Sequence, residues 1–295
     1  MTETLLAPTA DAVPLDLAVI IPSHNVADTL GDQLDALTAE RWTRPWGIVV
    51  VDNRSTDATR AVAEGYADRG VRVVVADARG GVAYARNSGV RAVDAKAVAF
   101  CDGDDVVQPG WVKAMGEALD QADIVSGYND TTVLNPAWLA ATRPGGTRGQ
   151  LSKFGRVPFA SGGNGGMRKS LFERLAGYDE DFVGLEDIEF SLRAHSVGAR
   201  FAAADAVISY RYRHDLKDLW KQGRAYGRGR PVLAEQARSL GLDGPKRHEG
   251  LRSWAWLLVH APDLRHKTGR FKWVWVLANR IGVIEGALHA RILQL

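Results

Sequence analysis

The sequence has very little cysteine, since Cys101 is the only one among 295 residues. A single thiol excludes an intramolecular disulfide framework and a cysteine-based zinc site. Long apolar runs are missing as well: every stretch of 18 residues contains a charged side chain, so a membrane-spanning helix is not expected. Residues 1–14 lack the basic start and apolar core of a signal peptide. We therefore expect a cytoplasmic protein, either soluble or peripheral to the inner face of the membrane.

Charge is balanced over the whole chain but uneven along it. The 37 Lys and Arg residues and 35 Asp and Glu residues give a net charge of +2. Residues 1–190 hold 18 basic and 27 acidic side chains, whereas residues 191–295 hold 19 and 8, together with five of the nine tryptophans. This asymmetry predicts different partners for the two parts of the chain. The basic residues form no recognised nucleic-acid-binding module, so nucleic acid is not an expected partner.

Apolar runs alternate with helix-like stretches in the first half of the chain. Buried strands are expected at residues 17–22, 47–51, 71–76 and 97–101. Helices are expected at 27–39, from just after residue 57 to about 69, at 82–93 and at 111–122. This alternation indicates βαβ units, hence an α/β fold with a mostly parallel, Rossmann-like sheet flanked by helices. Later segments predict strands at 124–128 and 206–212, a helix at 185–196, a long loop over the sheet edge at 135–159, and helices from 216 with a break near 241–245.

Polar clusters follow three of the predicted strands. They are Ser23-His24-Asn25, Asp52-Asn53 and Asp102-Gly103-Asp104-Asp105. In an open parallel sheet the ligand crevice lies at the carboxyl ends of the strands. Each cluster alone could consist of helix caps and turn residues. Three clusters at the same edge of the sheet favour a binding site.

The Asp102-Gly103-Asp104 segment is the sharpest local signal. Two carboxylates two residues apart, just past a buried strand, can hold Mg²⁺ or Mn²⁺ together with phosphate oxygens. The alternative is a solvated Asp-Gly turn. The apolar strand that leads into the segment favours the metal site.

Arg86 and the Glu186-Asp187 pair are further candidates. An arginine near a diphosphate can form bidentate, charge-assisted hydrogen bonds, although a surface arginine on a helix is the commoner case. Acidic residues in the first turn of a helix are favoured by the helix dipole. A carboxylate there could also take the proton of a sugar hydroxyl as a general base.

Two nucleotide-binding signatures are absent. The first strand is not followed by G-x-G-x-x-G, which disfavours a dinucleotide fold of the NAD type. The glycine-rich segment 162–170 ends in Lys-Ser like a P-loop, but an arginine rather than a glycine precedes the lysine. We therefore do not interpret this segment as a P-loop.

Taken in order, these segments resemble glycosyltransferase family 2, whose members are inverting enzymes of the GT-A fold that use nucleotide-sugar donors. The motifs that carry the resemblance are IIPSHN at 20–25, VVDNRSTD at 50–57, ARNSG at 85–89, FCDGDD at 100–105, GYDEDF at 177–182 and GLEDIEF at 184–190. They span about two-thirds of the chain. One departure is the Ala78-Arg79-Gly80-Gly81 turn, where the family commonly has an asparagine before the glycines.

The resemblance implies a role for each matching residue. The nucleoside pocket would be lined by Pro22, His24, Asn25, Asp52 and Asn53, and Arg86 would help to hold the nucleotide. The metal–diphosphate motif would be Asp102, Gly103 and Asp104, with Mn²⁺ or Mg²⁺ as cofactor. Asp187 would be the catalytic base, Glu186 would place the acceptor or donor sugar, and Asn164 would lie under the donor sugar. His214 is either a third metal ligand, as in some GT-A enzymes, or a surface residue.

The implied function is metal-dependent, inverting transfer of a sugar from a nucleotide-diphosphate sugar, with UDP-sugars favoured, to an acceptor hydroxyl in glycan, glycolipid or glycoconjugate biosynthesis. Two alternatives remain open. A sugar-nucleotide nucleotidyltransferase should have a Gly-rich, Arg-containing loop after the first strand, and a non-catalytic nucleotide-sugar-binding protein on the same fold would tolerate loss of the acidic residues. The Gln-x-x-Arg-Trp motif of processive polymerases is missing, so single addition is expected.

These motifs divide the chain into a lead-in at 1–15, a GT-A catalytic domain at 16–215 and a basic, Trp-rich helical extension at 216–295. The extension could pack on the sheet, form a homodimer or lie in a membrane interface. The charges at Lys272, Arg280, Glu285 and Arg291 do not fall on one helical face. Packing or dimerisation is therefore favoured over membrane attachment.

Overall fold

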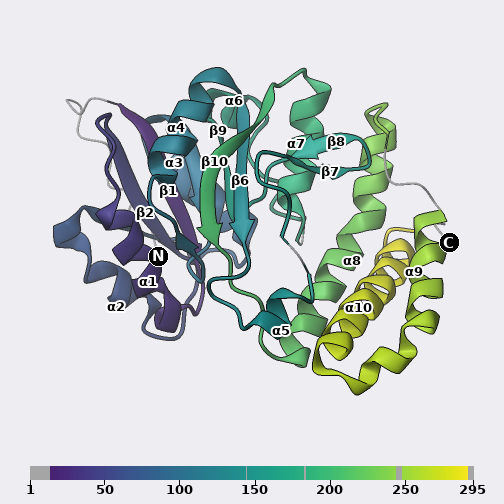
Figure 1. Ribbon diagram of the computed structural model, residues 1–295. Coiled ribbons are helices and arrows are strands. Elements are labelled where there is room, and N and C mark those ends of the chain that lie inside the picture. The colour runs from purple at the N-terminus through teal and green to yellow at the C-terminus, as the bar shows by residue number, and fades with distance from the viewer. Residues whose placement is uncertain (1–13, 144, 183, 244–247, 292–295) are drawn as a thin grey trace.

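The computed structural model describes residues 14–143, 145–182, 184–243 and 248–291 (Figure 1). The predicted lead-in lies outside these ranges except for its last two residues. Leu15 already belongs to the first strand. The break expected near 241–245 falls partly on residues outside the described ranges.

The structure alternates strands and helices in its first half and ends in helices. The strands are β1 (Leu15–Ser23), β2 (Trp46–Asp52), β3 (Val71–Val75), β4 (Ala95–Cys101), β5 (Val106–Val107), β6 (Ile124–Asp130), β7 (Ser152–Phe154), β8 (Val157–Phe159), β9 (Asn164–Arg168) and β10 (Phe201–Ser209). The helices are α1 (Ala27–Ala39), α2 (Thr59–Glu64), α3 (Val82–Arg91), α4 (Trp111–Gln121), α5 (Ala137–Ala140), α6 (Lys169–Arg174), α7 (Glu186–Ser196), α8 (Leu216–Ser239), α9 (His248–Val259) and α10 (Lys267–His289), with short 3-10 turns η1 (Ala67–Arg69) and η2 (Ala261–Arg265).

Eight strands form one sheet in the order β3-β2-β1-β4-β9-β6-β10-β5. The first four are parallel, β9 runs antiparallel to both of its neighbours, and β10 is parallel to β6. Ser23 at the end of β1 pairs with Asp52 at the end of β2. The polar clusters that follow these strands therefore meet at one edge, and the predicted fold class is confirmed.

Side chains of β1 alternate between the two faces of the sheet, as the two-residue period of a strand requires. Leu17, Val19 and Ile21 pack against α1 and α4, whereas Ala18 and Ile20 lie on the other face, with α3, α6 and α7. All five are fully buried. Both faces of the strand are thus in the core, which explains its continuous apolar sequence.

Strand β9 was not expected from the sequence, because it lies in the glycine-rich segment 162–170. Glycine is normally unfavourable in strands. Here a Cβ on Gly166 would lie 3.0 Å from the Val98 carbonyl oxygen of β4, and one on Gly165 would lie 2.6 Å from the Ser161 carbonyl oxygen. Close approach of neighbouring backbone therefore requires these glycines.

Two further boundaries differ from expectation. The predicted loop 135–159 contains α5 and the hairpin of β7 and β8. The strand expected at 206–212 begins earlier, at Phe201, and ends at Ser209. Its alanines carry no local strand signal, and pairing with β6 extends the strand over them.

The C-terminal region is helical, and α8 and α10 cross at glycines (Figure 1). A Cβ on Gly227 would collide with the Asn279 carbonyl oxygen, and one on Gly282 would collide with the Arg224 carbonyl oxygen. Glu285 of α10 accepts hydrogen bonds from Arg224 and Arg228 of α8. The two helices therefore form one closely packed unit. Among the described residues, no helix combines the length and the hydropathy that spanning a bilayer needs.

Candidate functional site

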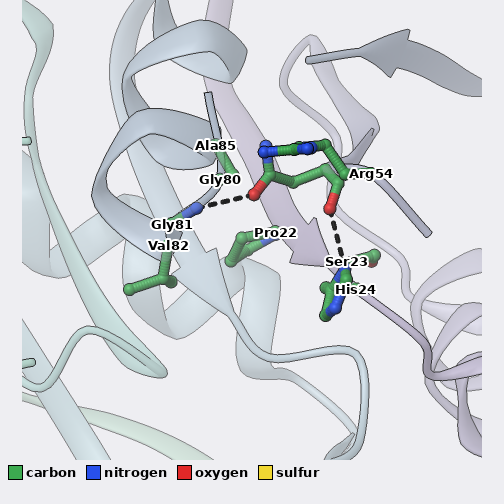
Figure 2. A pocket seen from close by; sticks show the side chains of 9 residues that line it. Pro22, Ser23, His24, Arg54, Gly80, Gly81, Val82 and Ala85 are labelled. Atoms are coloured by element: carbon green, nitrogen blue, oxygen red, sulfur yellow. Dashed lines mark hydrogen bonds between the residues drawn. The ribbon is translucent and has the colours of Figure 1, made fainter. Parts of the chain in front are cut away.

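A pocket of about 430 Å³ opens at the carboxyl ends of β1 and β2 (Figure 2). It is lined by Pro22, Ser23, His24, Asn53, Arg54, Gly80, Gly81, Val82 and Ala85. Of the residues predicted for the nucleoside pocket, Pro22, His24 and Asn53 belong to this lining. Asn25 and Asp52 do not.

The buried Asn53 side chain shapes the pocket instead of pointing freely into it. Its Nδ2 donates to the carbonyl oxygens of Ala76 and Arg79, and its Oδ1 accepts from the Gly81 backbone N–H at 2.8 Å. The Asn53 carbonyl oxygen in turn lies 2.8 Å from His24 Nδ1. Asn53 thus fixes the Gly80-Gly81 turn and the histidine ring around the cavity.

Asp52 and Asn25 hold the loops behind the pocket. Asp52 is buried, and its Oδ1 accepts from the Ser55 backbone N–H at 3.2 Å. Asn25 adopts a left-handed backbone conformation, and its Oδ1 accepts from the Thr56 backbone N–H at 2.8 Å. Both predicted binding residues are therefore engaged in loop geometry, which the sequence had allowed as the alternative for residues of this type.

Three carboxylates gather in the loop after β4. One side-chain oxygen each of Asp102, Asp104 and Asp105 lies within 4.8 Å of the others. Asp105 is 1% exposed, and its Oδ2 is buried without a hydrogen-bond partner among the described residues. Burial, followed by the charges of Asp102 and Asp104, raises the pKa of Asp105 well above its usual range. An orphaned carboxylate oxygen beside two further carboxylates fits the oxygen-rich ligand set of a divalent cation.

The third side chain of this cluster is Asp105, and His214, which the resemblance offered as a third metal ligand, is not part of it. His214 is exposed and lies outside the cluster. Its neighbour Arg213 does reach the loop, with Nη1 2.7 Å from Asp104 Oδ2. The Arg211 backbone N–H donates to Asp105 Oδ1 at 2.7 Å. The segment after β10 thus supplies cations and donors to the acidic loop.

Gln33 of α1 was missed by sequence reasoning. It is completely buried, donates from Nε2 to the Asp102 carbonyl oxygen at 3.0 Å, and accepts at Oε1 from the Val107 backbone N–H at 2.9 Å. Its amide therefore holds both ends of the acidic loop. A polar residue on the core-facing side of an amphipathic helix was the available signal, because a buried amide must find hydrogen-bond partners.

Arg86 is buried between two carboxylates. Its Nη1 donates to Glu186 Oε1 and its Nη2 lies 3.1 Å from Asp102 Oδ1. The guanidinium also lies 5.9 Å from the Phe100 ring centroid and 5.8 Å from that of Tyr178. Although burial opposes the charged form, the two carboxylates raise the pKa of Arg86 above its usual value. Arg86 and Glu186 are thus paired with each other. Their expected contacts with the nucleotide and the sugar stay predictions.

Asp187 lies at the start of α7 and faces the glycine segment. Its Oδ2 accepts from the Gly162 backbone N–H at 2.8 Å, and its Oδ1 accepts from the Ile188 backbone N–H at 2.8 Å. Burial and the adjacent Glu186 raise the pKa of Asp187 to about 6, against the opposing effect of the Gly162 hydrogen bond. A carboxylate of this pKa is ionised at neutral pH and more basic than an ordinary aspartate.

Gly162 and Gly163 allow this arrangement. A Cβ on Gly162 would lie 2.7 Å from Arg86 Nη1, and one on Gly163 would lie 2.5 Å from Asp102 Oδ2. The glycines that imitate a P-loop in the sequence therefore let the backbone approach the Arg86–Asp102 pair. Their neighbour Asn164 is fully buried, accepts from Trp111 Nε1 and donates to the Tyr128 carbonyl oxygen. The structure places Asn164 in the core, and its expected position under the donor sugar stays a prediction.

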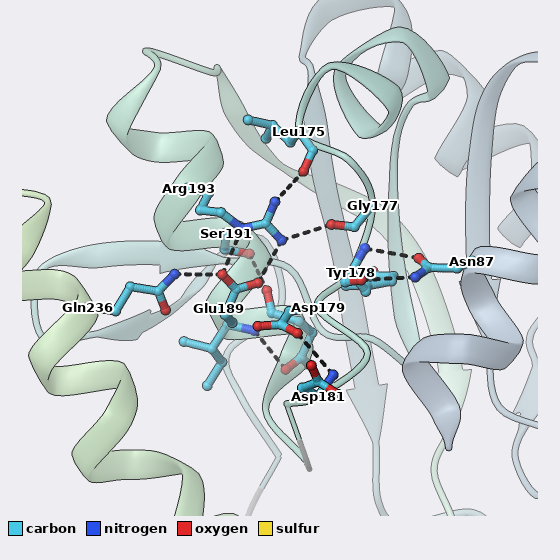
Figure 3. A network of polar contacts seen from close by, with 12 residues as sticks. Asn87, Leu175, Gly177, Tyr178, Asp179, Asp181, Glu189, Ser191, Arg193 and Gln236 are labelled. Carbon is cyan, nitrogen blue, oxygen red and sulfur yellow. Dashed lines mark hydrogen bonds and ion pairs between the residues drawn. The ribbon is translucent and has the colours of Figure 1, made fainter. Parts of the chain in front are cut away.

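The loop before α7 is held from two sides (Figure 3). On one side, Asn87 of α3 donates to the Tyr178 carbonyl oxygen at 2.9 Å and accepts from the Tyr178 backbone N–H at 2.9 Å. On the other, Arg193 donates to the Gly177 carbonyl oxygen at 2.8 Å. This clamp fixes the chain that leads into Glu186 and Asp187.

The C-terminal region also reaches the site. Gln236 of α8 donates to Glu189 Oε1 of α7 at 2.6 Å (Figure 3). Tyr226 of α8 lies near Gly184, with its ring centroid 5.8 Å from that of Trp275. Burial, followed by the charges of Asp187, Asp102 and Glu186, raises the pKa of Tyr226 to about 12. The sequence offered no signal for Tyr226, because it lies far from the motifs.

Known proteins resemble this chain in sequence and in fold. The family model described as Glycosyl transferase family 2 matches residues 18–176. The glycosyltransferase EpsJ of Bacillus subtilis, described as uncharacterized, is 30% identical over 221 residues, which are 70% of this chain and 63% of EpsJ. The chain thus spans less than two-thirds of the length of this relative.

Two solved structures share the fold. The mannosyltransferase PcManGT of Pyrobaculum calidifontis, in complex with GDP-Man and Mn²⁺, is 19% identical with a TM-score of 0.58, covering 95% of this chain and 91% of that one. The S. aureus TarS fragment 1–349, in complex with UDP-GlcNAc, is 15% identical with a TM-score of 0.55, covering 94% and 92%. Both likenesses extend over the C-terminal helices as well as the sheet.

Proposed function

The chain belongs to glycosyl transferase family 2, and from this premise we propose that it transfers a sugar from a nucleotide-diphosphate sugar to an acceptor hydroxyl, with inversion at the anomeric carbon. The observation that carries the proposal is Asp187: a carboxylate with a pKa of about 6, held by two backbone N–H groups beside an acidic loop. The division into a catalytic part, 16–215, and a helical extension, 216–295, remains part of the proposal. We also propose that Tyr226, which belongs to the helical extension, contributes to the active site.

The donor nucleoside would occupy the pocket at the ends of β1 and β2. The apolar lining from Pro22, Val82 and Ala85 suits the face of a base or ribose, and His24 is oriented by the Asn53 carbonyl oxygen. UDP is the nucleotide we favour, supported by the complex of TarS with UDP-GlcNAc. The GDP-Man complex of PcManGT makes GDP-sugars the comparison in the test.

The diphosphate would lie over the acidic loop, with Mn²⁺ or Mg²⁺ held by Asp102, Asp104 and Asp105. A bound divalent cation would neutralise the charge of the leaving diphosphate. The Mn²⁺ in the PcManGT complex supports this choice of ion. Gln33 would keep the loop in place, and Arg213 would balance the charge of Asp104.

Asp187 would act as the general base on the acceptor. Its carboxylate takes the proton of the acceptor hydroxyl as the oxygen attacks the anomeric carbon, and the bond to the diphosphate breaks on the opposite face. Arg86 serves this step indirectly, because it neutralises Glu186 and Asp102 and so keeps neighbouring negative charge from raising the pKa of Asp187 further. The acceptor belongs to glycan, glycolipid or glycoconjugate biosynthesis in this proposal.

The test is Asp187→Asn, assayed with a panel of UDP- and GDP-sugars in the presence of Mn²⁺. We expect transfer to fall by about three orders of magnitude or more, while the donor still raises the Tm as it does in the wild type. Asp205→Asn is the matched control, since Asp205 is an exposed aspartate on β10. Donor binding without transfer by the wild type would identify a non-catalytic binding protein. Equal loss of binding and transfer in Asp187→Asn would assign Asp187 a structural role.

A further inference from the structure

Helix α9 presents an apolar stripe to solvent. Leu251, Leu258 and Val259 are 73%, 80% and 72% exposed, and Trp254 and Ala255 are exposed between them. At 3.6 residues per turn, these five positions share one face of the helix. A helix normally turns such a stripe toward the core.

The opposite side of α9 already has its partner. Leu257 is buried, and its carbonyl oxygen accepts from Trp273 Nε1 of α10 at 2.9 Å. α10 itself lies between α9 and α8, which leaves α9 at the margin of the molecule (Figure 1). Leu251, Leu258 and Val259 therefore face solvent, whereas Trp254 at the edge of the stripe also lies under Arg280 of α10, whose Cζ is 5.9 Å from the ring centroid. Leu264 of η2 is exposed as well.

Cations outnumber acidic residues around this stripe. Between residues 248 and 284 the chain has six Lys and Arg residues and two acidic ones, Glu249 and Asp263. Arg252, Arg265 and Arg270 are exposed, and none forms an ion pair with another described residue. Arg252 adjoins Leu251 on α9, and Arg265 follows Leu264. Exposed leucines and a tryptophan beside unpaired arginines are the combination that binds an anionic membrane interface.

We propose that α9 and η2 dock on the surface of an anionic lipid bilayer, with the apolar stripe in the headgroup region and the flanking arginines on lipid phosphates. The occupant is a membrane and not a second copy of the chain, because a like surface would bring the unpaired arginines of two copies together. The helices lie on the bilayer and do not cross it. This attachment would hold the crevice near acceptors carried by lipids.

Vesicle co-sedimentation of the full chain tests the docking surface. We expect the chain to sediment with vesicles of phosphatidylcholine and phosphatidylglycerol, more weakly with phosphatidylcholine alone, and less as salt rises. Leu251→Gln combined with Leu258→Gln should lower the partition coefficient by about tenfold or more. Arg265→Gln combined with Arg270→Gln should lower it on the order of twentyfold. Val197→Gln is the matched control, since Val197 is 51% exposed outside the helical extension, and it should change nothing.

The result that would overturn the proposal is a chain that stays in the supernatant with both kinds of vesicle, or one whose binding ignores both pairs of substitutions. A dimer in light scattering that Leu251→Gln with Leu258→Gln dissociates, without vesicle binding, would assign the stripe to a second copy instead. The measurement needs no donor or acceptor, and Asp187→Asn should bind vesicles like the wild type. Failure of the membrane proposal is thus separable from failure of the proposed transfer reaction.

Discussion

The crevice at the ends of the parallel strands and the C-terminal helices use their polar groups in opposite ways. In the crevice, Asn53, Gln33 and Arg86 are buried and bound to defined partners. On α9 and η2, arginines are exposed beside bare leucines. A reaction centre requires groups held in place before the substrate arrives, whereas a peripheral docking surface requires groups still free to bind. The crevice is therefore the preorganised part of the molecule, whereas the surface of α9 and η2 is the part whose groups are free to bind.

The strongest test of this preorganisation is Arg86→Met. It leaves Glu186 and Asp102 facing each other without the cation between them, so we expect a loss of about 3–5 kcal/mol in the free energy of unfolding, measured by urea denaturation. The matched control is Arg79→Met, because Arg79 forms its ion pair with exposed Asp181, and we expect a change within about 0.5 kcal/mol. Similar losses in the two variants would contradict the distinction between a preorganised centre and a solvated surface.

Gly227→Ala tests whether the helical region is itself tightly packed behind its exposed face. The added methyl group would collide with the Asn279 carbonyl oxygen at the crossing of α8 and α10, so we expect a loss of about 1–3 kcal/mol in the free energy of unfolding. Gly146→Ala serves as the control, since a Cβ there meets nothing within 4 Å among the described residues. If Gly227→Ala unfolds at the same urea concentration as the wild type, the two helices are not closely packed.

The pH profile of transfer tests the electrostatics of the crevice. Because the pKa of Asp187 is raised to about 6, the base is ionised above this pH and protonated below it. We expect kcat to be level above pH 7 and to fall roughly tenfold per pH unit below pH 6. Donor binding followed by thermal shift over the same range shows whether loss of the nucleotide causes the fall. A kcat that stays level down to pH 5 would exclude Asp187 as the base.

Tyr226→Phe tests the link between the two regions with the smallest expected effect. Its hydroxyl belongs to a helix of the extension, yet the charges of Asp187 and Asp102 act on it. We expect kcat to fall by about threefold to tenfold, with the Tm nearly unchanged. Tyr66→Phe is the control, because it removes a hydroxyl that donates to the Gly31 carbonyl oxygen, far in sequence from Tyr226. This variant should leave kcat as it is. Unchanged kcat in both variants would confine catalysis to residues 16–215.

Sequence reasoning was most successful where the signal was local. The strands β1, β2 and β4 and the helices α1 and α3 were predicted within a few residues, because apolar runs and helical spacing report burial directly. It failed at β9, whose glycines argue against a strand until the neighbouring backbone of β4 is in view. The same limitation applies to β10, which pairing with β6 extends over alanines.

For the site, the sequence identified which residues belong to it better than it identified their roles. Asp102, Asp104 and Asp187 came from motifs and local chemistry, and the structure gathers Asp102 and Asp104 with Asp105. The sequence could not show that Arg86 and Glu186 pair with each other, since they are 100 residues apart. Nor could it show that Asn164 is bound in the core, because hydrogen-bond partners of a buried amide are supplied by distant elements.

The sequence by itself determined the alternation of strands and helices, the family and the edge of the sheet at which polar groups meet. These follow from period, order and residue type along the chain. Only the tertiary structure decided which polar groups are bonded within the fold and which remain for a ligand, that Tyr226 of α8 lies near Gly184 just before α7, and that Leu251, Leu258 and Val259 of α9 are exposed. Burial and pairing depend on what lies on the other side of a residue, and that neighbour is most often far away in the chain.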